Sequence, residues 1–153
     1  MKTSAGLLMY KKTPKGLQFL LAHPGGPFWK NKDFGAWGIP KGGVEEGEEI
    51  FEAAKREFFE ETGIKSQGEF IELGFVKQTH KTVHAWAFEG DFSGFRVRQS
   101  TIKIEFPPKS GKIIEVPEVD KISFFNLEQA KQKIIPAQFC FLEKLNEKLS
   151  SCS

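Results

Sequence analysis

Three glutamates near the middle of the chain, Glu57, Glu60 and Glu61, have the side-chain type and spacing of a divalent-cation site. Residues three and four apart lie on one face of a helix, so this spacing brings the carboxylates together. Carboxylate oxygens are hard ligands that suit Mg²⁺ or Mn²⁺ rather than zinc. A solvated acidic helix face fits the same pattern, because repulsion between exposed like charges costs only about 0.2–0.5 kcal/mol per pair.

A helix over residues 48–62 is the element that must position these carboxylates. Phe51, Ala54 and Phe58 have the i, i+3, i+7 spacing of an apolar stripe, and Gly63 suits the left-handed position just after a helix. Carboxylates in a last turn meet the negative end of the helix dipole, which costs about 0.3–1 kcal/mol each. A helix selected for stability would have Lys or Arg there, so the acidic end favours a functional role.

Residues 42–64 resemble the Nudix box. Gly42 is followed by five residues and Glu48, and then, after seven more residues, by Arg56-Glu57-Phe58, Glu60-Glu61 and Gly63-Ile64. Every fixed position of the motif is matched. The resemblance implies a Nudix hydrolase with an α+β fold, an α/β/α sandwich with a mixed β-sheet in which the box forms a loop–helix–loop.

The resemblance also implies roles for the residues of the box. Glu57, Glu60 and Glu61 would bind Mg²⁺ or Mn²⁺, and Glu60 or Glu57 would act as the general base. Arg56 would hold a glutamate in position through a fork-shaped ion pair. Helical spacing alone makes Arg56 a surface partner of Glu52 or Glu60, which is compatible with that role.

The segment before the box, Trp37-Gly-Ile-Pro-Lys-Gly, is similar to the segment found in the dinucleoside polyphosphate branch of the family. It implies that Lys41, Gly42 and Gly43 contact substrate phosphates, although an exposed lysine after a turn proline explains Lys41 equally well. The branch commonly has His and Pro where this chain has Gly43 and Glu46. The implied activity is metal-dependent hydrolysis of a diphosphate linkage, first of all in a dinucleoside polyphosphate of the diadenosine tetraphosphate type.

Three alternative functions remain open. One is hydrolysis of nucleoside triphosphates to monophosphate and pyrophosphate, and another is nucleotide binding without catalysis. Isomerisation of an isoprenoid diphosphate is disfavoured, because it requires a nucleophilic cysteine in the site and the only cysteines, Cys140 and Cys152, lie in the terminal helix and tail.

Several residues outside the box are further candidates. Glu115 or Glu118, on either side of Pro117, could act as the late-loop acid that serves as base or ligand in various family members. Trp86 could stack on a base, although an aromatic residue on an alternating strand is more often part of the core. The 23–35 loop has no assigned role. Basic candidates for phosphate contacts are Lys77, Lys81, Arg96, Arg98 and Lys103.

Composition limits the class of protein. We expect 153 residues to form a single domain, residues 1–153. The net charge of +2 is too small for a nucleic-acid-binding stripe, so the expected partner is a small-molecule nucleotide. Two cysteines favour a reducing cytoplasm, and no apolar run approaches the length of a membrane span. The oligomeric state stays open.

The order of predicted elements is neither all-α nor a repeated βαβ series, which favours an α+β fold. Predicted strands cover residues 4–11, 17–23, 37–39, 68–79, 82–89, 102–106 and 121–125, and predicted helices cover 48–62, 127–134 and 139–149.

Overall fold

Strand β1 (Lys2–Thr13) is the centre of the main sheet in the computed structural model, which describes residues 2–91 and 101–150. It pairs in parallel with β5 (Lys81–Glu89) on one side. On its other side it pairs antiparallel with β3 (Lys41–Gly43) and then with β2 (Gly16–Pro24). With β4 (Ile71–Gln78) and β8 (Val119–Asn126) at the edges, the order is β4-β5-β1-β2-β8. The sheet is therefore mixed, as predicted.

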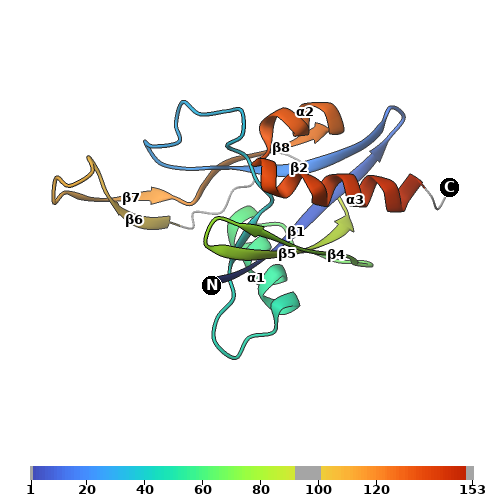
Figure 1. Cartoon of the computed structure of the whole chain (residues 1–153), viewed down its shortest axis with the longest axis horizontal. Coiled ribbons are helices and arrows are strands. Elements are labelled where there is room, and N and C mark those ends of the chain that lie inside the picture. The colour runs from blue at the N-terminus through green and yellow to red at the C-terminus, as the bar shows by residue number, and fades with distance from the viewer. Residues whose placement is uncertain (1, 92–100, 151–153) are drawn as a thin grey trace.

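Helices cover both faces of this sheet (Figure 1). Helix α1 (Ile50–Thr62) packs on one face. Helices α2 (Leu127–Lys133) and α3 (Phe139–Ser150) lie on the other, with the short 3-10 turn η1 (Pro136–Gln138) between them. The predicted α/β/α sandwich is thus confirmed.

Alternating residues of the central strands build the two cores. Leu7 and Met9 pack in the cluster that contains Ala54 and Phe58 of α1. Their neighbours point to the opposite face, because successive side chains of a strand alternate. That face packs against the C-terminal helices, and its buried residues include Leu8, Tyr10, Phe19, Leu21, Ala130, Leu142 and Leu145.

Strands β6 (Thr101–Glu105) and β7 (Ile113–Pro117) form a separate two-stranded sheet. This hairpin extends away from the sandwich (Figure 1). Strand β7 was not predicted from the sequence. Only Val116 of its five residues is buried, so the strand lacks the hydrophobic alternation that marks a half-buried strand.

The remaining differences concern element boundaries. The predicted strand 37–39 makes only isolated bridges, Trp37 with Ile134 and Gly38 with Ala22, and the strand that pairs with β1 follows it at Lys41–Gly43. Helix α1 begins at Ile50, two residues later than predicted, because residues 44–49 form the loop that leads into it.

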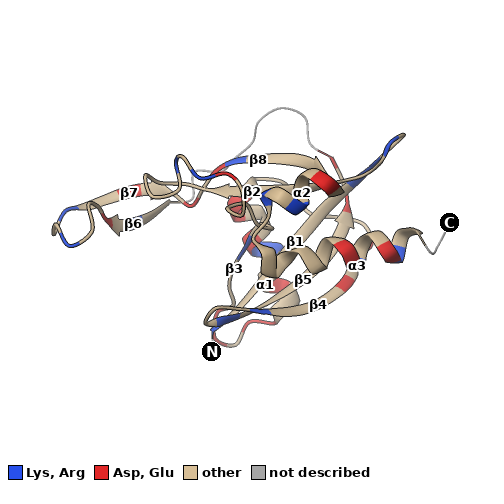
Figure 2. Cartoon of the chain, turned by 45° about the horizontal axis from the view of Figure 1, so that its top comes forward, with Lys and Arg blue, Asp and Glu red and all other residues tan. Residues whose placement is uncertain are grey.

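Lys and Arg are distributed over several elements rather than along one stripe (Figure 2). Among the described residues, no helix is long and apolar enough to cross a membrane.

Candidate active site

Helix α1 carries the three glutamates, and its ends lack two of the usual stabilising features. Glu49 at its N-terminus makes no side-chain capping bond, and its last turn contains no basic residue. Gly63 ends the helix in the left-handed conformation with φ of 75°, and its N–H donates to the Phe59 carbonyl at 2.8 Å. The predicted helix stop is therefore present.

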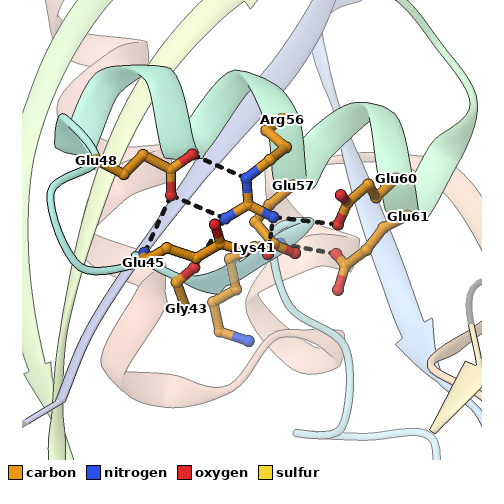
Figure 3. Close-up of polar contacts among 8 residues, drawn as sticks. All are labelled: Lys41, Gly43, Glu45, Glu48, Arg56, Glu57, Glu60 and Glu61. Atoms are coloured by element: carbon orange, nitrogen blue, oxygen red, sulfur yellow. Dashed lines mark hydrogen bonds and ion pairs between the residues drawn. The ribbon is translucent and has the colours of Figure 1, made fainter.

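Arg56 joins the loop before α1 to two of the glutamates (Figure 3). Its Nε and Nη2 donate to the two oxygens of Glu48 at 2.8 and 3.0 Å. Its Nη1 donates to Glu57 Oε1 at 2.8 Å and to Glu60 Oε2 at 3.2 Å. Nη2 also donates to the Gly43 carbonyl at 3.0 Å. The guanidinium thus fixes the loop and both carboxylates in one network.

Of the two partners that helical spacing allows for Arg56, the structure has one. Glu60 is a partner, but Glu52 pairs with Lys55 at 2.7 Å instead. Glu48 takes the place expected for Glu52, because the loop before the helix brings its carboxylate back alongside Arg56.

The pKa values of Glu48 and Glu57 are shifted in opposite directions. The hydrogen bonds from Arg56, together with the Glu45 N–H, lower the pKa of Glu48 to about 2. For Glu57, burial raises the pKa in spite of Arg56, and the nearby charges of Glu60 and Glu118 add to the rise. Glu57 therefore has more affinity for a proton than an exposed carboxylate has.

Glu61 is the most buried of the three glutamates, with 8% of its surface exposed. Its Oε2 accepts the Lys41 backbone N–H at 2.8 Å, which connects the helix end to strand β3 (Figure 3). Burial raises the pKa of Glu61 to about 8, although the Lys41 charge and N–H oppose the rise. Burial also lowers the pKa of the Lys41 ammonium.

Gly42 is required by the position of Glu57. A Cβ at Gly42 would lie 2.0 Å from Glu57 Oε2 and 2.1 Å from its Cδ, closer than atoms can approach. A Cβ at Gly43 would meet no atom within 4 Å. Close contact between the strand and the carboxylate therefore explains a glycine at 42 but not at 43.

The donor set fits a hard divalent cation. Glu57, Glu60 and Glu61 supply only carboxylate oxygens, the ligands that Mg²⁺ and Mn²⁺ prefer. The buried Glu61 carboxylate has no hydrogen bond from a cationic side chain within the described residues, and a cation would compensate its charge. Among the described residues, no three or more His, Cys, Asp or Glu side chains are positioned so that together they could hold a metal ion. Arg56 is hydrogen-bonded to both Glu57 and Glu60.

A cavity of about 270 Å³ lies beside Glu61. Its polar lining comes from β3, α1, β4, β5 and the connection between β7 and β8, and comprises Lys41, Glu61, Gln78, Lys81 and Glu118. Trp29, Ile39, Val119 and Ile135 contribute apolar surface. A mostly apolar hollow with a few convergent polar groups is the usual form of a small-molecule site.

The 23–35 loop contributes Trp29 to this cavity and is held in place by His23. The His23 ring is 1% exposed, and its Nδ1 lies 2.9 Å from Asp120 Oδ1 while its Nε2 lies 2.6 Å from the Lys32 carbonyl. Phe28 packs edge-on against Trp29 with ring centroids 5.0 Å apart. The loop, which had no role at the level of sequence, is one wall of the cavity.

Some of the other residues singled out from the sequence line the cavity, and some do not. Glu118 and Lys81 line the cavity, whereas Glu115 accepts a hydrogen bond from Thr101 on the β6–β7 hairpin. Trp86 packs against Phe51 of α1, with ring centroids 4.9 Å apart, and does not line the cavity. Arg96, Arg98 and Cys152 are outside the described residues.

The NUDIX domain family model matches residues 2–145 of the chain. An RNA pyrophosphohydrolase from Rhodopseudomonas palustris (strain HaA2) is 32% identical over 114 residues, which cover 73% of this chain and 65% of the relative. The chain thus spans about two thirds of the length of that curated relative. Among solved structures, a Caenorhabditis elegans Ap4A hydrolase binary complex has a TM-score of 0.67 at 24% identity and covers 99% of both chains. The NUDIX domain of Shewanella oneidensis NrtR, solved with ADP ribose, has a TM-score of 0.68 at 13% identity and covers 97% of this chain and 88% of that one.

Proposed function

The chain belongs to the NUDIX family, and we propose that it hydrolyses a diphosphate linkage of a nucleoside polyphosphate with the help of Mg²⁺ or Mn²⁺. The observation that carries this proposal is the group of three glutamates on α1, two of them bound to Arg56, beside a cavity that also contains Lys41. One of the candidate metal ligands, Glu61, and a cationic contact for phosphate, Lys41, thus border the same cavity.

Each residue has a role that follows from its contacts. Glu57, Glu60 and Glu61 would hold the cation. A divalent cation bound there would neutralise phosphate charge and make water a stronger acid. Arg56 keeps Glu57 and Glu60 in place from one side, which limits the motion of either carboxylate.

Proton removal from the attacking water is assigned to Glu57 or Glu60. The raised pKa of Glu57 gives this carboxylate more affinity for a proton, which suits a general base. Glu60 is the more accessible group, with 43% of its side chain exposed, and one of its oxygens is bound to Arg56. Separate Glu57→Gln and Glu60→Gln variants distinguish them when both are assayed at saturating Mg²⁺, because the variant that lacks the base then has the lower kcat.

Dinucleoside polyphosphates are the proposed first substrate class. Lys41 precedes Gly42 at the cavity, where its ammonium can pair with a phosphate oxygen, and Trp29 offers an aromatic surface for a base. The overall similarity to an Ap4A hydrolase structure is in line with this choice. The name of the curated relatives supports a second class, RNA carrying a 5′ polyphosphate.

A substrate panel tests the proposal. Diadenosine tetraphosphate, nucleoside triphosphates, ADP-ribose and an RNA with a 5′ triphosphate would be incubated with Mg²⁺ or Mn²⁺ and separated by ion exchange. We expect ATP and AMP from the tetraphosphate. Two ADP would contradict the point of attack, and cleavage of the RNA or triphosphate alone would assign the other substrate class. That residues 1–153 form one domain and that the protein is cytoplasmic stay predictions.

A further inference from the structure

Two glutamine side chains form a hydrogen-bonded relay at the wall of the cavity. Gln138 is fully buried, its Oε1 accepts the Ile39 backbone N–H at 2.9 Å, and its Nε2 donates to Gln78 Oε1 at 2.9 Å. Gln78 ends strand β4 and lines the cavity, whereas Gln138 lies in the turn before α3. The relay therefore connects residues that are far apart in the sequence.

The relay determines which way both amides point. A backbone N–H can only donate, so Gln138 must turn its carbonyl oxygen toward Ile39 and its NH₂ toward Gln78. Gln78 must then turn its own carbonyl oxygen to Gln138. This leaves the Gln78 NH₂, which has no hydrogen-bond partner in the part of the chain that the structure describes.

Gly38 provides the space for this arrangement. A Cβ at Gly38 would lie 3.0 Å from Gln138 Oε1 and would press on the amide. The amide is thus held by two hydrogen bonds and by close contact with the backbone. Gln78 can therefore offer a donor, and not an acceptor, to a ligand in the cavity.

Lys81 adds a positive charge next to this donor. Gln78 and Lys81 are directly opposite in the antiparallel pairing of β4 with β5, so their side chains lie on the same face. Both residues line the cavity. An amide NH₂ and an ammonium are both hydrogen-bond donors. Together they suit a ligand group that carries negative charge and has only acceptor oxygens.

We propose that Gln78, oriented by Gln138 and assisted by Lys81, binds a phosphoryl group of the substrate beyond the one held near Lys41 and the glutamates. Gln78 is a binding residue and Gln138 a positioning residue. This corner of the cavity, formed by Gln78 and Lys81, selects for the length of the phosphate chain. A nucleoside monophosphate has no second phosphoryl group to place there. This inference rests on the proposed function, since it assumes a nucleotide in the cavity.

Equilibrium binding separates this inference from catalysis. The dissociation constants of a methylene-bridged, non-hydrolysable nucleoside triphosphate and of the corresponding monophosphate would be measured by calorimetry in Mg²⁺. For Gln78→Leu we expect triphosphate affinity to fall by about tenfold to a hundredfold, the effect of losing a hydrogen bond to a charged group. Gln78→Glu should lose more, because it places a carboxylate against the phosphate. Monophosphate affinity should stay within about twofold.

Two further variants control the experiment. Gln67→Glu introduces the same charge at an exposed position outside the cavity and should leave both affinities unchanged. Gln138→Leu should weaken triphosphate binding in the wild-type background but not in Gln78→Leu, because it acts through Gln78. A purely structural role would weaken both ligands in both backgrounds.

The outcomes distinguish the two proposals. Equal losses for triphosphate and monophosphate, no loss in Gln78→Leu, or no binding of the triphosphate analogue to the wild-type chain would overturn the inference. If the wild-type chain binds the analogue with the expected pattern but cleaves no nucleotide, the proposed function fails and this binding corner stands.

Discussion

Gly42→Ala should remove activity without unfolding the protein. The new Cβ would lie 2.0 Å from Glu57 Oε2, whereas real Cβ atoms essentially never come within 3.0 Å of another atom, so the carboxylate must move by about 1 Å or more. A displacement of about 1 Å at a catalytic group can cost on the order of a hundredfold in rate. We therefore expect kcat/KM to fall by at least about a hundredfold, or about 2.7 kcal/mol of transition-state stabilisation.

Stability should change little in the same variant. The Glu57 side chain can rotate away, and loss of its ion pair with the partly exposed Arg56 costs up to about 1 kcal/mol. Replacing glycine by alanine where φ is not positive stabilises by about 0.4–1 kcal/mol through the unfolded state. The two effects nearly cancel.

Gly43→Ala is the matched control, because it makes the same change one residue later and meets no atom within 4 Å. The assay is steady-state hydrolysis of the best substrate in the panel, with thermal unfolding of each variant. The reasoning is refuted if the two variants lose activity equally, or if Gly42→Ala retains the wild-type rate.

Three other predictions concern charges in the box and directly before it. Glu48→Gln should have a lower melting temperature than the wild type above about pH 4.5, and this difference should disappear toward pH 2. The reason is that the pKa of Glu48 in the folded protein is about 2, against an ordinary 4.5. Thermal melts that show a constant difference over this range would contradict the prediction. Lys41→Met should reduce kcat/KM for a tetraphosphate more than for a diphosphate, since more anionic charge lies within reach of the ammonium; kinetics on both chain lengths check this, and equal losses would mean that Lys41 does not contact the phosphate chain. Millimolar Mg²⁺ should raise the melting temperature of the wild-type chain by mass action, and an unchanged melting temperature would count against a metal site.

Local pattern predicted the elements and residues that depend on nearby sequence. The helix that carries Glu57, its stop at Gly63 and the contact between Arg56 and Glu60 all follow from spacings within one helix. The sandwich and the mixed sheet were predicted from the order of elements and from the resemblance to the Nudix family, and both are confirmed.

Features that depend on tertiary contact were not predicted. Gln78 and Gln138 are 60 residues apart, and a glutamine has no pattern that reveals its partner. Glu48 reaches Arg56 only because the preceding loop folds back, which helical spacing does not describe. The burial of Glu61, and with it the raised pKa, requires the Lys41 N–H of strand β3 to approach the end of the helix.

The most direct test of the metal-dependent hydrolase is the turnover of Glu61→Gln in Mg²⁺. The amide has the shape of the carboxylate and can still accept the Lys41 N–H, so the variant should fold as the wild type does. Because it loses the buried charge that would hold the cation, we expect kcat to fall by about a thousandfold or more, equivalent to about 4 kcal/mol. A folded Glu61→Gln variant with a kcat within about tenfold of wild type would contradict the assignment.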